Sequence, residues 1–254
     1  MRKIRTIIPV MLTMLILGIR SAALYALDDD ISRGDDYKKD IQTRIVDRIA
    51  LPKGYHEGLF YDGEYIWVTN GKGINTWIID PSSGSILSMI KPVGSFTEGL
   101  AEAGEGYLYL ADWDEKKLFK VSIKKETMSR SGQIDFAPAR PTGVVRIGGD
   151  TYVITWTRGL GTKYHLLKLD SSGNILGKVR IKDIHEPAHM AWDGEHLWIT
   201  SWYSQRVYKV DLESLRIIGE FRSPVSKTTG ITWDGKYFWL TGTYSDLYRV
   251  EVIE

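Results

Sequence analysis

The sequence predicts an all-β fold, a five-bladed β-propeller whose blades each contain four antiparallel strands. The main observation is a short phrase that recurs five times. Its second positions are Gly58, Gly99, Gly143, His189 and Gly230, so that the steps are 41, 44, 46 and 41 residues. A period in the low forties with several short strands per repeat is typical of propellers. Turn signals separate β-branched and aromatic runs, and no segment has the apolar period of a long amphipathic helix.

Each repeat contains four predicted strands. The first is the recurring phrase, and an Asp-Gly pair follows it at 62–63, 193–194 and 234–235. This pair favours a tight hairpin turn, in which both central residues need a positive φ. The second strand is aromatic and β-branched, and the third alternates polar and apolar residues. Trp67, Trp198 and Trp239 recur on the second strand, and we expect them in the blade cores.

The two ends of the chain are predicted to share one blade. The fifth repeat stops at Glu254, after its third strand, whereas residues 44–51 precede the first repeat and have the pattern of a fourth strand. Pairing the two would complete the last blade and would remove an open sheet edge. The predicted propeller therefore covers residues 44–254.

Two segments precede this predicted domain. Residues 1–26 have a basic start, a short apolar run at 7–17 and small residues before Ala23 and Ala26, which is the pattern of a cleaved secretory signal peptide. The apolar run is shorter than the roughly 20 residues of a membrane span. We therefore expect a periplasmic or extracellular protein without a membrane span after cleavage, the alternative being an uncleaved anchor. Residues 27–43 are charged and are predicted to be a disordered, solvated tail.

Composition narrows the function classes. The chain has no Cys, which excludes disulfides and thiolate metal sites. Removing residues 1–26 takes away four basic residues, so that 29 basic and 32 acidic residues remain and the net charge is near −3. Such a balance gives no reason to expect a nucleic-acid partner. No phosphate-binding loop or Ser nucleophile motif is present. We expect a monomer without a cofactor.

Aligning the five repeats identifies a candidate site. One equivalent position on the first strands is held by Glu57, Glu98, Thr142, Ala188 and Thr229. Because the first strands of propeller blades surround the axis, two carboxylates are predicted near one mouth of it. A carboxylate in a cavity that excludes water has a raised pKa and can transfer protons. The alternative is that these acids only bind backbone amides.

Aromatic residues are predicted at the same mouth. The positions after the second strands include Trp113, Trp156, Trp202 and Thr243. An aromatic cup with acids at its base suits a small ligand that carries an amine or an amide, because aromatic faces attract cations. Packing between blades is the alternative role of these indoles.

Several phrases resemble the plant-type glutaminyl cyclase family, also called glutamine cyclotransferases. They are Tyr55-His56-Glu57-Gly58-Leu59, Phe96-Thr97-Glu98-Gly99, Trp113, Trp202, the stretch 230–234 and Thr241-Gly242, and the likeness covers residues 44–254. The resemblance implies cyclisation of an N-terminal Gln to pyroglutamate with release of ammonia, with Glu98 as the proton shuttle. The substrate, a peptide with an N-terminal Gln or another small ligand at the axial mouth, would contact Tyr55, Glu57, Phe96, Trp113, Trp156, His189, Trp202 and Thr243.

The sequence also departs from that family. The family has Lys where this chain has Thr243, Gln where it has Glu57, and an Asn-Glu-Leu-Glu stretch where it has residues 186–189. A non-catalytic propeller that binds a ligand or a protein is therefore a second hypothesis. Metal sites are a third: His189 could join His185 and Glu186, or a calcium-dependent lactonase site could form from Glu57, Asn70, Glu98 and Asp112.

Overall fold

The computed structural model describes residues 30–72, 75–124 and 126–253. Within these ranges the chain forms 21 β-strands and no helix, in agreement with the predicted all-β class. It follows that no helix in the described part could cross a membrane. The signal peptide predicted for residues 1–26 lies outside the described residues.

The strands are organised in four-stranded runs that follow the sequence repeats. The first repeat forms a sheet of β3 (His56–Tyr61), β4 (Ile66–Asn70), β5 (Thr76–Ile79) and β6 (Ile86–Ile90). The second forms a sheet of β7 (Thr97–Glu102), β8 (Tyr107–Asp112), β9 (Lys117–Lys124) and β10 (Thr127–Asp135). The last forms a sheet of β19 (Thr228–Trp233), β20 (Phe238–Gly242) and β21 (Leu247–Val252), completed by β2 (Thr43–Ile49).

The third and fourth repeats belong to one nine-stranded sheet. The third contributes β11 (Arg140–Ile147), β12 (Asp150–Thr157), β13 (Lys163–Leu169) and β14 (Ile175–Ile181). The fourth contributes β15 (Pro187–Trp192), β16 (Leu197–Ser201), β17 (Arg206–Asp211) and β18 (Arg216–Arg222). The N-terminal strand β1 (Asp30–Lys38) lies between β14 and β18 and joins the two runs.

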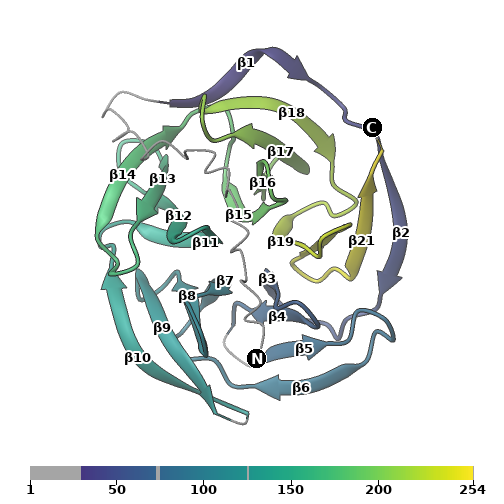
Figure 1. Ribbon diagram of the computed structural model, residues 1–254, viewed down its shortest axis with the longest axis vertical. Helices are drawn as coiled ribbons and strands as arrows, with labels where there is room; N and C mark the ends of the chain where they lie inside the picture. Colours follow the sequence, from purple (N-terminus) through teal and green to yellow (C-terminus); the bar gives the residue numbers. More distant parts are fainter. Residues whose placement is uncertain (1–29, 73–74, 125, 254) are drawn as a thin grey trace, which may run out of the picture.

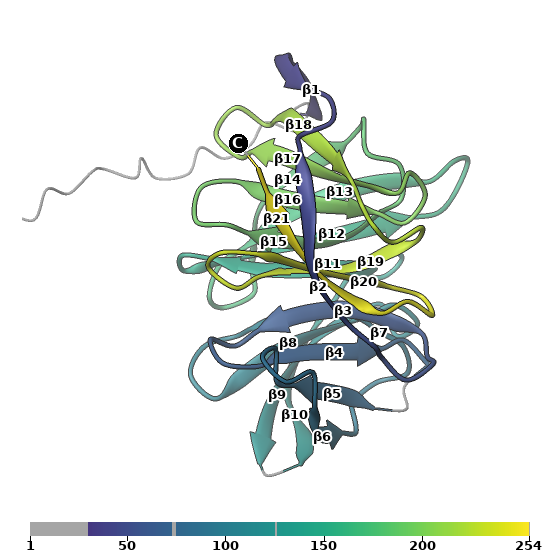
Figure 2. The same cartoon turned by 90° about the vertical axis from the view of Figure 1, so that its right-hand side faces the viewer.

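The first strand of every repeat lies at the centre of the molecule. Figure 1 shows β3, β7, β11, β15 and β19 nearest the middle, with the later strands of each repeat farther out, and Figure 2 gives the view turned by 90°. Each inner strand contacts the next one: β3 with β7, β7 with β11, β11 with β15, β15 with β19, and β19 with β3. This closed ring brings equivalent positions of all repeats to one axis, which is the arrangement of a β-propeller.

The strand β2 closes the ring of sheets as predicted. It pairs antiparallel with β21, with Thr43 opposite Val252 and Ile49 opposite Leu247. β2 therefore supplies the fourth strand that the last repeat lacks, and a segment near the N-terminus pairs with the last strand of the propeller.

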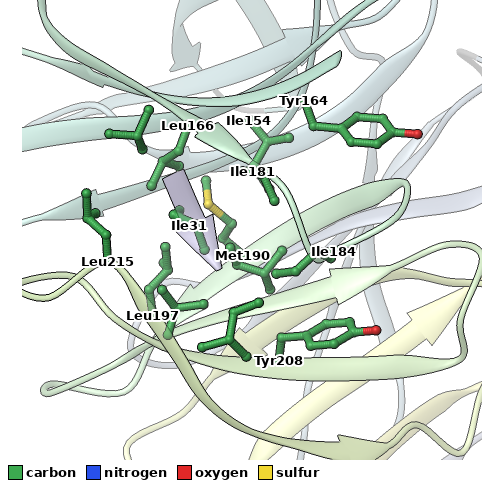
Figure 3. Close-up of a cluster of buried hydrophobic side chains, with 14 of the residues drawn as sticks. Ile31, Ile154, Tyr164, Leu166, Ile181, Ile184, Met190, Leu197, Tyr208 and Leu215 are labelled. Atoms are coloured by element: carbon green, nitrogen blue, oxygen red, sulfur yellow. The ribbon is translucent and has the colours of Figure 1, made fainter. Parts of the chain in front are cut away.

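The prediction of a solvated tail over residues 27–43 is wrong where the structure describes this segment. Residues 30–38 form β1, which runs parallel to both β14 and β18, for example with Asp30 opposite Arg180 and Ser32 opposite Arg216. Ile31 is fully buried in an apolar cluster shared by the third and fourth repeats (Figure 3). One well-placed apolar side chain and an open strand edge were enough to order a segment that composition marks as disordered.

The charges of this segment also have partners. Glu220 of β18 is only 4% exposed, and its carboxylate lies 4.0 Å from the Arg33 guanidinium and 3.5 Å from that of Arg206. Arg206 in turn contacts Asp40. Because a buried carboxylate is costly without partners, Arg33 of this segment has a stabilising role beside a buried acid elsewhere in the chain.

Candidate functional site

The cavity at one mouth of the ring has a volume of about 500 Å³, within the range of small-molecule sites. It is lined by eight of the nine residues predicted for the site. These are Tyr55, Glu57, Phe96, Glu98, Trp113, Trp156, Trp202 and Thr243. The structure therefore gathers side chains that are up to 188 residues apart (from position 55 to position 243) at one place.

The five aligned positions of the first strands meet at this cavity, and we take them as its base. Glu57, Glu98, Thr142, Ala188 and Thr229 all line it. They lie within the first three residues of β3, β7, β11, β15 and β19, so that the ring of inner strands sets their spacing. Two acids, two hydroxyls and one methyl group thus occupy equivalent positions. The asymmetry of this ring places both acidic side chains on the side of the first two repeats.

The inner strands approach closely just beyond this ring. A Cβ added to Gly99 would lie 2.3 Å from the Thr142 carbonyl oxygen, and one added to Gly230 would lie 2.3 Å from the carbonyl oxygen of Glu57. Neither position could carry a side chain without moving backbone, which is the physical reason for glycine there. The recurring glycine is therefore a consequence of closing the ring.

His189 occupies the position that is glycine in the other four repeats, and it lies below the cavity. It is 1% exposed, its Nδ1 lies 3.1 Å from the Ile231 carbonyl oxygen, and its Nε2 lies 3.1 Å from a Cβ built on Gly58. Burial lowers the pKa of His189 to about 4, so the ring is neutral at pH 7. The imidazole fills the axis but is not among the cavity residues, which differs from its predicted contact with substrate.

The two carboxyl groups at the base are held in surroundings that favour their protonated forms. Glu57 is 5% exposed, and burial followed by repulsion from Glu98 raises its pKa well above that of an ordinary carboxyl. Burial, with the charges of Asp112 and Asp114, raises the pKa of Glu98 to about 8. A pair of acids with perturbed pKa values in a cavity is a typical feature of proton-transfer sites.

Asp112 positions the segment that carries Phe96 and Glu98. Its Oδ2 accepts hydrogen bonds from the backbone N–H groups of Ser95 (2.6 Å) and Phe96 (2.9 Å), and its Oδ1 accepts one from Glu115 N–H (2.8 Å). The carboxylate is fully buried. All its contacts are structural, and its charge also contributes to the raised pKa of Glu98.

The aromatic wall is built by edge-to-face contacts. Trp113 and Trp156 have ring centroids 5.3 Å apart at an interplanar angle of 82°, and Tyr55 lies edge-to-face with Tyr244 at 4.9 Å. The indole N–H of Trp156 donates to the Pro187 carbonyl oxygen at 2.8 Å. These rings pack between repeats and line the cavity at the same time.

The donor groups of the metal hypotheses are not assembled. Among the residues that the structure describes, no three His, Asp or Glu side chains lie close enough to hold a metal ion. This concerns both the set of His185, Glu186 and His189 and the acids of the calcium set. His185 instead packs edge-to-face on Tyr203, with centroids 4.7 Å apart.

Four cavity residues belong neither to the nine predicted site residues nor to the aligned ring. Arg158, Glu186, Lys227 and Tyr244 also line the cavity. Arg158 lies two residues after Trp156, and Tyr244 directly follows Thr243, so extending the aligned positions by two residues would have found both. Lys227 and Glu186 each lie two residues before a member of the ring. The alignment began at the ring and therefore missed them.

Lys227 lies next to the predicted residue Thr243. The carbonyl oxygen of Lys227 would be 2.0 Å from a Cβ on Gly242, so the two backbones touch where Thr243 follows. The ammonium group lies 4.3 Å from the centroid of the Trp202 ring, a cation–π contact. A cation therefore enters the cavity from the connection that precedes β19, beside the backbone that leads to Thr243.

Glu186 adds a third carboxylate. Its backbone has a φ of 50°, an uncommon conformation for a residue with a side chain. Its Oε2 is buried without a hydrogen-bond partner among the described residues. An unsatisfied acceptor in a ligand-sized cavity is a natural position for a donor group of a bound molecule.

Comparisons with known proteins support the fold. The structure is similar to glutaminyl cyclase from Myxococcus xanthus, with a TM-score of 0.67 and 18% identity over 86% of this chain and 99% of that one. Virginiamycin B lyase from Staphylococcus aureus is also similar, with a TM-score of 0.47 and 16% identity over 78% of this chain and 66% of that one. No sequence-family model and no curated protein sequence matches the chain. At 18% identity, the likeness to the Myxococcus xanthus protein shows the fold alone, a β-propeller.

Proposed function

We propose that this protein is a five-bladed propeller, each four-stranded run being one blade, that acts as a glutaminyl-peptide cyclotransferase. The observation that carries this proposal is the placement of two acids with raised pKa values at the base of an aromatic cavity. An N-terminal glutaminyl residue has an ammonium group and a neutral amide, which match the acids and the aromatic wall.

In the proposed reaction Glu98 moves protons within the bound substrate. Its carboxylate accepts one proton from the α-ammonium group, and the free amine attacks the side-chain amide carbon to form the five-membered ring. Glu98 then returns the proton to the amide nitrogen as the old C–N bond breaks. The remaining extra proton of the ring nitrogen leaves with ammonia as ammonium. A carboxyl with a pKa of about 8 is well matched to both transfers near neutral pH.

Lys227 is the proposed partner of the developing oxyanion. The resembling family uses a Lys where this chain has Thr243, and a hydroxyl is a weaker stabiliser of negative charge. Lys227 lines the same cavity, and its backbone packs on Gly242. A positioned cation at the amide oxygen would lower the barrier because negative charge develops there only in the transition state. Glu57 and Glu186 would hold the ammonium group before Glu98 accepts its proton.

The decisive test is ammonia release from a Gln-initiated peptide by the purified protein. We expect turnover by the wild type and a loss of at least about a hundredfold in kcat for Glu98→Gln, because general acid–base groups contribute factors of this size. Glu105→Gln is the matched control, since Glu105 is an exposed acid away from the cavity. Circular dichroism would verify that each variant is folded.

Undiminished ammonia release by Glu98→Gln would contradict the assigned role. A second candidate, a binding propeller without turnover, is favoured by the single observation that Thr243 replaces the family Lys. It would be supported if the folded wild type released no ammonia but still bound a Gln-initiated peptide in the cavity. We further propose that the protein is exported and monomeric, which follows from its predicted signal peptide and its closed ring of sheets.

A further inference from the structure

We infer that the site selects peptides with an acidic side chain directly after the N-terminal residue. This inference rests on the proposed function and names the substrate class of the same cavity. It follows from two cations, Lys72 and Arg158, that lie on aromatic rings of the cavity wall, whereas Glu57 and Glu98 lie on the ring of inner strands.

Two cations at the mouth have no acidic partner among the residues that the structure describes. Lys72 has its ammonium 4.3 Å from the Tyr55 ring centroid, and Arg158 has its guanidinium carbon 5.1 Å from that of Trp113. Both side chains are exposed, and no described carboxylate lies within 4 Å of either. Two cations from different repeats are therefore free to meet an anion on a bound molecule.

A comparison with Arg140 shows that not every cation on the Trp113 ring is available to a bound molecule. Arg140 lies on the same Trp113 ring at 5.1 Å, but it donates to the Trp113 carbonyl oxygen at 2.9 Å and lies 3.5 Å from Asp114. The guanidinium group of Arg140 thus already has partners within the protein. Arg158 contacts the same ring without such partners, and stacking on an indole restricts where its charge can be.

The direction of the bound peptide follows from these charges. The ammonium group of the first residue is attracted to Glu57 and Glu98 at the base, so the chain must leave through the mouth. The second side chain then passes Tyr55 and Trp113, where Lys72 and Arg158 lie. An acidic side chain at this position gains two favourable interactions, whereas a basic one meets two like charges.

The test uses amidated tripeptides that differ only at the second residue: Gln-Glu-Ala, Gln-Ala-Ala and Gln-Lys-Ala. We expect kcat/KM for the Glu peptide to exceed that for the Lys peptide by about tenfold at low salt, and high salt to reduce this ratio. In the double variant Lys72→Gln/Arg158→Gln the ratio should fall to about twofold or less. Lys178→Gln, an exposed lysine of β14 outside the cavity, should leave it unchanged.

Binding of Asn-initiated peptides separates this inference from the reaction itself. Asn lacks one methylene and cannot close the five-membered ring, so calorimetry can compare Asn-Glu-Ala with Asn-Lys-Ala without turnover. If no Gln peptide releases ammonia but the Asn series keeps the tenfold preference, the reaction is wrong and the charge selection holds. Equal affinity for the two Asn peptides, or a preference that survives in the double variant, would overturn the inference.

Discussion

The two ends of the inner strands differ in what the repeats share. At the end away from the cavity, three repeats have the same arrangement. Asp62, Asp193 and Asp234 each accept a hydrogen bond from the indole N–H of the Trp five residues later, at 2.7, 2.6 and 2.7 Å. At the cavity end the equivalent residues are Glu57, Glu98, Thr142, Ala188 and Thr229, and the repeats diverge.

The two remaining repeats explain the shared arrangement. Where the second strand has Tyr109 or Val153 in place of the Trp, the residue five positions earlier is Gly104 or Gly148 instead of Asp. The aspartate is therefore present only where a buried indole N–H needs an acceptor. Within one chain, the comparison shows that repetition marks packing requirements, whereas the departures from it lie at the candidate site.

The largest effect that tests this comparison is expected at Lys227. Removing the cation in Lys227→Ala should lower kcat by about a hundredfold or more with little change in the free energy of unfolding, because an oxyanion donor acts mainly in the transition state. Ammonia-release kinetics and urea denaturation measure the two quantities. Adding Thr243→Lys to this variant should restore part of kcat. If Lys227→Ala retained full activity, the proposed oxyanion partner would be wrong.

The second expected effect lies at the other end of the strands. Asp193→Ala removes the acceptor of the Trp198 indole and of two backbone N–H groups, those of Glu195 at 2.8 Å and His196 at 2.6 Å. We expect a loss of about 2–4 kcal/mol in the free energy of unfolding, since buried donors are left without partners. The kcat of the folded protein should not change. Urea unfolding and ammonia release, compared with Glu195→Ala as the exposed neighbour, would check both expectations.

The comparison also explains how much could be predicted from the sequence. The features that the repeats share could be predicted, because each repeat packs in the same way. They include the strands, the closing role of β2 and the core positions of Trp67, Trp198 and Trp239. The ring at the cavity was found by asking where repeats differ. Arg158 and Lys227 were missed because they lie on connections between strands, which have no repeated pattern.

The N-terminal segment could not be predicted for a different physical reason. Composition describes how a segment behaves alone, and residues 30–38 have too few apolar groups to fold alone. Their order comes from elsewhere in the chain: the edges of β14 and β18, the cluster around Ile31 and the buried carboxylate of Glu220. Such long-range partners are visible only when the sheets are placed in space.

The smallest expected effect is a gain in stability when the candidate proton shuttle is removed. The pKa of Glu98 is raised in the folded protein, so between the ordinary carboxyl pKa and about 8 the unfolded chain ionises more readily than the folded one. This difference is absent at low pH and destabilises the folded state increasingly as the pH rises. Glu98→Gln, which cannot ionise, should therefore raise the melting temperature at pH 8 by about 2 °C or more, but not at pH 4.

This last prediction distinguishes the cavity end of the inner strands from the opposite end, where aspartates accept hydrogen bonds from indole N–H groups. A residue kept for packing loses stability when it is replaced, as expected for Asp193. A residue kept for chemistry is held in unfavourable surroundings, so its replacement should abolish activity and yet stabilise the fold at neutral and alkaline pH. Calorimetric melting of the wild type, Glu98→Gln and Glu105→Gln at both pH values would measure it. A Glu98→Gln protein that melted lower than the wild type at pH 8 would identify Glu98 as a packing residue.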